Sequence, residues 1–154
     1  MIRFLFVIFF LYSNLTFSQV NLDSIVENLN NEILKKENYD LKKEERIDSL
    51  KSYLNHNTPP IERYEINNQI FKEYQFYSFN KALNYIEKNV KIAEEFKNTH
   101  LLNQSKLKLG LLLVNTGRYK ESLDALNSIK RKYLSSSLLS SYYLAFEEGY
   151  SGLS

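Results

Sequence analysis

The sequence contains no Cys and no Trp, only four Gly and two Pro, and no marked excess of charge of one sign. Without Cys the chain cannot form a disulfide scaffold, a thiolate zinc site, an iron–sulfur cluster or a cysteine nucleophile. So few turn-forming residues in 154 positions argue against an all-β fold and favour helices. The formal charge of +2, from 20 Lys+Arg and 18 Asp+Glu, gives no reason to expect nucleic acid or acidic lipid as a partner.

The first 18 residues differ from the rest of the chain and have the pattern of a secretory signal peptide. A single cation, Arg3, precedes the apolar run 4–11, and Thr16 and Ser18 are the small residues expected before a cleavage site after about Ser18. We therefore expect 1–18 to be removed and the mature chain to be periplasmic or secreted. The alternative is an uncleaved membrane anchor, although the apolar run is shorter than the ~18 residues of a spanning helix.

From position 22 onward apolar residues recur every three or four positions, which predicts an all-α fold of about six to seven helices after the leader. Segment 19–57 is expected to form either one long helix with a charged middle or two helices joined near Asn38. Pro59-Pro60 is the clearest break, because Pro fits the first turn of a helix but not its interior. Further helices follow over 58–134, and 135–154 begins one more.

A set of spaced residues around one turn forms a repeat pattern: Leu109, Gly110, Gly117, Tyr119, Ser122 and Leu126. The pattern resembles the tetratricopeptide repeat (TPR), a unit of about 34 residues whose two antiparallel helices stack into a right-handed solenoid. The resemblance implies that Gly110 lets the helices approach closely opposite Ser122, and that Gly117 turns the chain in a left-handed conformation. A weaker copy with Ala82 in the place of Ser122 lies 40 residues upstream, and an incomplete third copy begins near Leu138.

Segments 46–51, 62–74 and 103–109 carry a second, narrower resemblance. Together they resemble the N-terminal part of a Bacteroidetes-type family with a domain of unknown function. Its members have a signal sequence, a periplasmic TPR region, one membrane helix and a cytoplasmic segment similar to a helix-turn-helix regulator. The resemblance implies a Gram-negative periplasmic module that is the sensor arm of a membrane-bound transcriptional regulator. Since the membrane helix and the regulator segment are absent from the sequence, a truncated fragment without independent function is the alternative.

No residue pattern in the sequence is typical of catalysis. The two His, His56 and His100, have no further ligands at metal-binding spacing. Neither a carboxylate pair suited to acid/base work, nor a nucleophile elbow, nor a phosphate-binding loop is present. We therefore expect no metal, no cofactor and no enzymatic activity, with a secreted enzyme as a remote alternative.

The expected partner is a protein or peptide, and the TPR resemblance implies where it binds. The first helix of each TPR pair lines the concave side, which makes Gln104, Lys108 and Asn115 the expected exposed contacts. The carboxylate clamp of chaperone-binding TPR proteins needs Lys and Asn where this chain has Leu107 and Leu111, so that activity is not expected. Contact with a membrane is expected only through an uncleaved leader or a partner.

The last predicted helix has no second helix after it in the sequence. Tyr142, Tyr143 and Tyr150 lie on this helix. An apolar helix face without its partner must find another surface or stay disordered. These tyrosines are therefore candidates for self-association, and the end of the chain is alternatively disordered.

Overall fold

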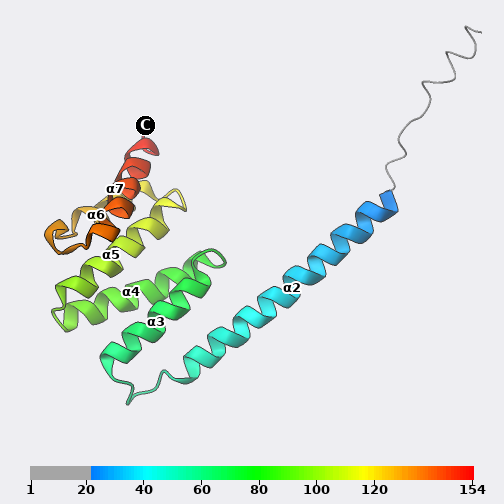
Figure 1. Cartoon of the computed structure of the whole chain (residues 1–154), viewed down its shortest axis with the longest axis horizontal. Coiled ribbons are helices and arrows are strands. Elements are labelled where there is room, and N and C mark those ends of the chain that lie inside the picture. Colours follow the sequence, from blue (N-terminus) through cyan, green and yellow to red (C-terminus); the bar gives the residue numbers. More distant parts are fainter. Residues whose placement is uncertain (1–21) are drawn as a thin grey trace, which may run out of the picture. The chain divides into compact units, whose positions relative to one another are not determined.

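The computed structural model describes residues 22–154, so the predicted signal peptide lies outside the described residues. Over this range the chain forms six α-helices and one short 3-10 helix, without a strand (Figure 1). The elements in chain order are α2 (Leu22–Ser52), α3 (Pro60–Tyr74), α4 (Phe79–Glu95), α5 (Thr99–Val114), α6 (Tyr119–Asn127), η1 (Arg131–Tyr133) and α7 (Ser136–Ser151). The prediction of an all-α fold is confirmed. No helix within 22–154 combines the length and apolar character required to cross a membrane.

Helix α2 is continuous, which corresponds to the first of the two arrangements predicted for 19–57. The chain divides into two compact units, the first ending at Leu41 and the second beginning at Lys42, inside this helix. In the first unit the apolar stripe of α2 is exposed to solvent: Leu22, Ile25, Val26, Leu29, Ile33 and Leu34. The second unit starts earlier than the predicted boundary between 57 and 58, because Ile47 and Leu50 pack into the core formed with α3 and α4.

Helix ends follow from local chemistry at a few positions. Helix α3 begins at Pro60, whose missing N–H costs no hydrogen bond in the first turn. The side chain of Asn98 accepts a hydrogen bond from the backbone N–H of Leu101 at 3.1 Å, which caps the start of α5 at Thr99. Gly117 has φ +75° in the α5–α6 turn, and Lys97 adopts the same left-handed region, with φ 52°, in the α4–α5 turn.

The helices pack mainly against their neighbours in the chain, so that the hairpins α3–α4 and α5–α6 form a TPR-like right-handed solenoid. Helix α7 follows and packs against both α6 and α5 (Figure 1). One core cluster joins the end of α2 to α3 and α4 and reaches α5 through Leu112. A second cluster joins α5, α6 and α7 around the fully buried Leu126. Each hairpin therefore stabilises the next through a shared apolar layer.

Apart from Gly117, which lies in the α5–α6 turn, the residues that define the repeat pattern lie at the contacts between helices. The Ser122 hydroxyl donates a hydrogen bond to the Gly110 carbonyl oxygen at 2.8 Å, and both residues are buried. A Cβ atom on Gly110 would lie 2.7 Å from Leu126 Cδ2, so no larger residue fits there without a shift. Ala82 is fully buried in the first cluster, and the partly buried Leu109 and Tyr119 complete the set.

Helix α7 differs from the prediction at one tyrosine. Tyr142 is only 8% exposed and lies in the second core cluster, with its ring edge-on to Phe146 at 4.9 Å between centroids. It was predicted to lie on an unpaired face, and that is wrong because α7 packs against both preceding helices of the solenoid. Tyr143 and Tyr150 are exposed, at 52% and 59%.

Candidate functional site

A pocket of about 180 Å³ opens between the C-terminal halves of α3 and α5. Its lining consists of four apolar residues (Phe71, Phe76, Leu111 and Leu112), two amides (Gln75 and Asn115) and one cation (Lys108). No carboxylate contributes to the wall. The pocket therefore combines an apolar surface with positive charge.

The sequence brings these side chains together through helical spacing. Lys108, Leu111 and Asn115 stand three and four positions apart, so they share one face of α5. Phe71 and Gln75 are four positions apart at the end of α3 and form the opposite wall.

A buried tyrosine fixes the distance between the two walls. The hydroxyl of Tyr64, on α3, lies 3.0 Å from Ser105 Oγ and donates to the Leu101 carbonyl oxygen at 3.3 Å. Burial raises the pKa of Tyr64, so the hydroxyl stays protonated at neutral pH. Because Ser105 and Leu101 belong to α5, this side chain ties the helices that form the pocket directly to each other.

Lys108 is the most unusual side chain of the pocket. It is half-buried, and its Nζ donates to Asn68 Oδ1 on α3 at 2.5 Å. Burial lowers the pKa of Lys108, and the like charge of Lys72 lowers it further, while Glu65 acts weakly in the opposite direction. Among the described residues no carboxylate lies within ion-pair distance of its ammonium group.

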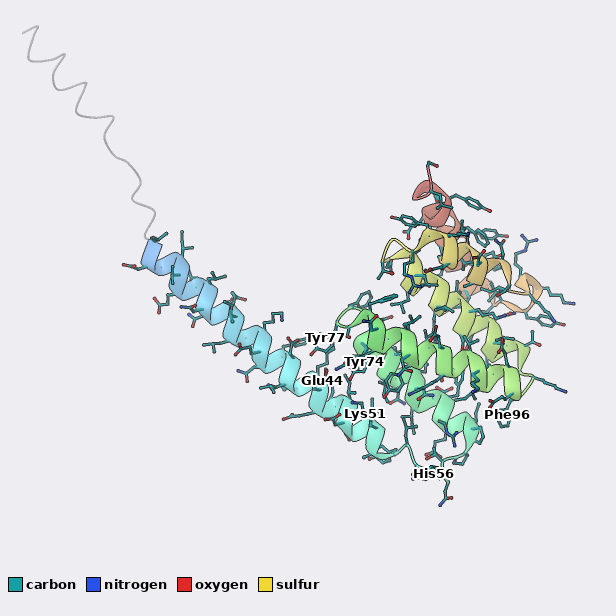
Figure 2. All side chains as sticks on the ribbon, turned by 180° about the vertical axis from the view of Figure 1, so that it is seen from behind. Glu44, Lys51, His56, Tyr74, Tyr77 and Phe96 are labelled. Atoms are coloured by element: carbon teal, nitrogen blue, oxygen red, sulfur yellow. The ribbon has the colours of Figure 1, made fainter. Side chains whose placement is uncertain are left out.

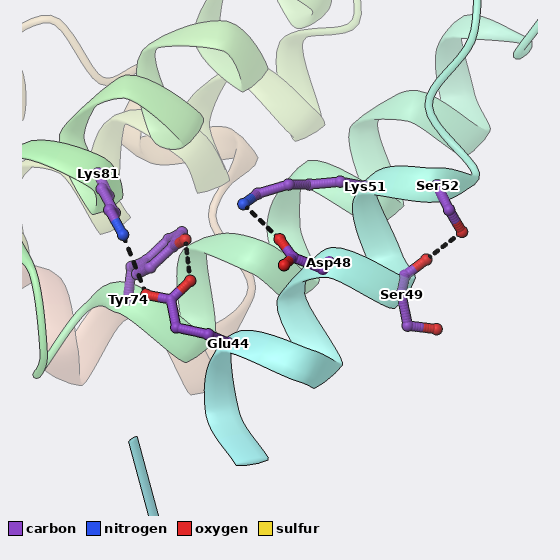
Figure 3. A network of polar contacts seen from close by, with 7 residues as sticks. All are labelled: Glu44, Asp48, Ser49, Lys51, Ser52, Tyr74 and Lys81. Atoms are coloured by element: carbon purple, nitrogen blue, oxygen red, sulfur yellow. Dashed lines mark hydrogen bonds and ion pairs between the residues drawn. The ribbon is translucent and has the colours of Figure 1, made fainter. Parts of the chain in front are cut away.

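Two other cations of this unit that are joined to a neighbouring helix, Lys81 and Arg46, have acidic partners. Glu44 accepts hydrogen bonds from Lys81 Nζ and from the Tyr74 hydroxyl, each at 3.0 Å (Figure 3). Partial burial acts to raise the pKa of Glu44, but the hydrogen bonds from Lys81 and Tyr74 and the positive charges of Lys81 and Lys51 together outweigh it and lower the pKa. In Figure 2 Glu44 on α2 and Tyr74 on α3 face each other. This network fixes the end of α2 to α3 and α4, and its charges are satisfied within the fold.

Phe76 stands beside the pocket in the turn after α3 and is 85% exposed. Single exposed apolar residues are common on protein surfaces, but aromatic residues are enriched where proteins bind one another. The sequence offered one signal for Phe76, since it lies outside the helical apolar stripes that account for most of the other aromatic residues. Phe71 gave no such signal, because it fits the stripe of α3.

The three predicted contact residues lie on one helix, but only two of them line the pocket. Lys108 and Asn115 are in its wall, whereas Gln104 is one turn earlier on α5 and is not part of the lining. Asn115 is exposed as expected, while Gln104 and Lys108 are half-buried because α3 lies against this part of α5.

Two other pockets are more open to solvent, and neither has an unpaired buried charge. One, of about 360 Å³, lies between the end of α2 and α3, where an ion pair of 3.3 Å joins Arg46 to Glu73. The other, of about 370 Å³, lies beside Tyr119 and the end of α7. Residues 22–154 contain no group of acidic, His or Cys side chains that could hold a metal ion, and both His56 and His100 are exposed (Figure 2 labels His56).

Comparison with known proteins places the chain in a family. The family model described as the SusR N-terminal TPR domain matches residues 33–154, which is most of the chain. Searches of curated proteins and of solved structures gave no match. The matched range contains every described helix except the first part of α2. The chain therefore belongs to the family of SusR N-terminal TPR domains.

Proposed function

We propose that the chain is a non-enzymatic, periplasmic protein-interaction module that binds a peptide segment in the pocket between α3 and α5. Membership of a TPR family supports a protein as the partner. In this proposal the module is the sensor arm of a membrane-bound transcriptional regulator, so the bound segment is the signal that it reads.

The observation that carries the proposal is the exposed Phe76 beside an apolar pocket on the α3–α5 face. The volume of about 180 Å³ is below the roughly 300–1,000 Å³ of pockets that enclose drug-sized ligands. It is suited to a single side chain projecting from a peptide. Aromatic residues beside such pockets typically supply a large share of binding energy in protein interfaces.

Peptide selection tests the proposal directly. A phage-displayed library of random linear peptides is selected against the purified chain, and enriched peptides are synthesised and titrated by fluorescence anisotropy. We expect Phe76→Ala to weaken binding about tenfold or more, the effect of losing one anchoring contact. Phe96→Ala is the matched control, because Phe96 is also exposed, at 59%, but lies in the turn after α4 and away from the pocket. Enriched peptides that bind Phe76→Ala as well as the unchanged chain would refute this site.

The periplasmic location has a separate test. Expression of the full chain in a Gram-negative host, followed by osmotic shock and N-terminal sequencing, should recover a protein that starts at Gln19. Recovery only from the cytoplasm with Met1 intact would contradict this part of the proposal.

A further inference from the structure

Lys108 combines partial burial with the absence of an acidic partner in residues 22–154. A cation that is removed from water loses hydration energy, and proteins usually restore that energy with a carboxylate. The more exposed Lys81 and Arg46 of the same unit both have carboxylate partners. Other cations of this unit therefore form ion pairs with carboxylates, whereas Lys108 forms none among residues 22–154.

Within residues 22–154 one polar contact of Lys108 is seen, and it uses one of the donors of the ammonium group. An ammonium group has three N–H donors, and Asn68 Oδ1 accepts one of them. Asn68 holds the ammonium group toward α3, one turn before Phe71 of the pocket lining. The charge of Lys72 adds to the positive potential there, and that of Glu65 reduces it. An anion entering the pocket would therefore meet a positioned donor that has no ion-paired carboxylate among residues 22–154.

The other lining residues indicate which chemical groups a ligand of this pocket should carry. Phe71 and Leu112 are buried apolar residues, and the exposed ring of Phe76 extends this surface outward. Gln75 and Asn115 are amides, which can donate to and accept from a peptide backbone on either side of the anchored residue. A ligand that satisfies all three features has a carboxylate, an adjacent apolar group and a main chain that continues past the pocket.

We propose that the α3–α5 pocket recognises an acidic side chain, Asp or Glu, next to an apolar residue in a bound peptide. The carboxylate accepts a hydrogen bond from Lys108 Nζ, and the neighbouring apolar side chain packs against Phe76. This inference rests on the proposed function and specifies the ligand class of the same site. The acidic residue lies within the peptide, because a single cation flanked by two amides leaves the chain free to continue in both directions.

A double-mutant cycle tests the assignment on the enriched peptides from the library selection. These peptides should contain Asp or Glu beside an apolar residue, and changing that Glu to Gln in a synthetic peptide should weaken binding about tenfold. In Lys108→Gln, which keeps a donor for Asn68 Oδ1, the same peptide change should have no effect. Lys106→Gln is the control, because Lys106 is also half-buried on α5 but does not line the pocket. A selection against Lys108→Glu should enrich Lys or Arg instead.

The outcomes separate this inference from the proposed function. If Phe76→Ala weakens binding but Lys108→Gln does not, the pocket binds peptides and the acidic assignment is wrong. If binding depends on a free C-terminal carboxylate and is lost on amidation, the assignment to a side chain is overturned. If neither substitution changes binding, the site itself is wrong. Circular dichroism of each variant shows whether the fold is retained. The selection against Lys108→Glu shows which charge the pocket prefers in a peptide, and it does so without a comparison of affinities.

Discussion

Substitution of Gly110 by Ala tests whether the contact between α5 and α6 has the tightness that the structure shows. A Cβ atom at this position would lie 2.7 Å from Leu126 Cδ2 and 2.8 Å from its Cγ. Real Cβ atoms do not approach carbon atoms so closely. Because the Cγ atom is involved, a rotation of the Leu126 methyl groups alone cannot relieve the overlap, and Leu126 is fully buried among neighbours of the second core cluster. The helices must therefore move apart or the core must repack.

The expected magnitude is the difference between two opposing effects. Overpacking of a dense core costs about 1–3 kcal/mol. Replacing a mid-helix Gly by Ala gains about 1 kcal/mol in helix propensity. We therefore expect Gly110→Ala to lower the free energy of unfolding by up to about 2 kcal/mol, which is the steric cost less the propensity gain.

A second substitution, at Leu126, should reverse the sign of the effect that Gly110→Ala has on the free energy of unfolding. Leu126→Ala removes the atoms that clash, at a cost of about 2–5 kcal/mol for the cavity left in the core. In that background Gly110→Ala should raise stability by up to about 1 kcal/mol, since only the propensity gain remains. Urea denaturation followed by far-ultraviolet circular dichroism measures all four members of the cycle. If Gly110→Ala destabilises the chain equally in both backgrounds, contact with Leu126 is not the cause.

Three further effects can be measured on the purified chain. Lys97→Gly should raise the thermal midpoint, because relieving a non-glycine residue at φ 52° is worth about 1 kcal/mol, and an unchanged midpoint would contradict this. Tyr64→Phe removes the hydroxyl that joins α3 to Ser105 and should cost about 1 kcal/mol in urea denaturation; a cost near zero would show that the link adds nothing. The lowered pKa of Glu44 means that its contacts with Lys81 stabilise the fold above the unfolded-state pKa near 4.5 and are lost as the pH falls through the folded-state value. Glu44→Gln should therefore reduce stability by less than about 1 kcal/mol at neutral pH and by a smaller amount in acid; an equal loss at both pH values would argue against this ion pair.

The elements of the fold could be predicted because their signals are local. The start of α3 at Pro60 and the left-handed turn at Gly117 depend on the backbone preferences of single residues. The apolar periodicity likewise indicates which face of α3 to α7 is buried, whereas the apolar stripe at the start of α2 is exposed. These features require no knowledge of what the helix packs against.

The pocket required information that periodicity does not contain. Lys108 and Asn115 were predicted as contacts from the expected face of α5, but the partial burial of Lys108 goes with its contact to Asn68, which is 40 positions away on another helix. The spacing of apolar residues shows that a helix has a buried face, but not which neighbour covers its edge. The same limit explains Tyr142, since its burial depends on how α7 lies against α5 and α6.

Packing between consecutive helices has a consequence for how the second unit folds and responds to a ligand. Because α3 to α7 make most of their contacts with sequence neighbours, folding closes only short loops, which favours fast folding and a stability that adds up from pairwise interfaces. In such a one-dimensional array, opening at one end affects distant helices only weakly. Contacts between α3 and α5 skip one position in this order, so a peptide held between them would add to the coupling that the α4–α5 interface already provides between the two hairpins. Binding would then act as a gain in cooperativity across the array, without any need for a large change in shape.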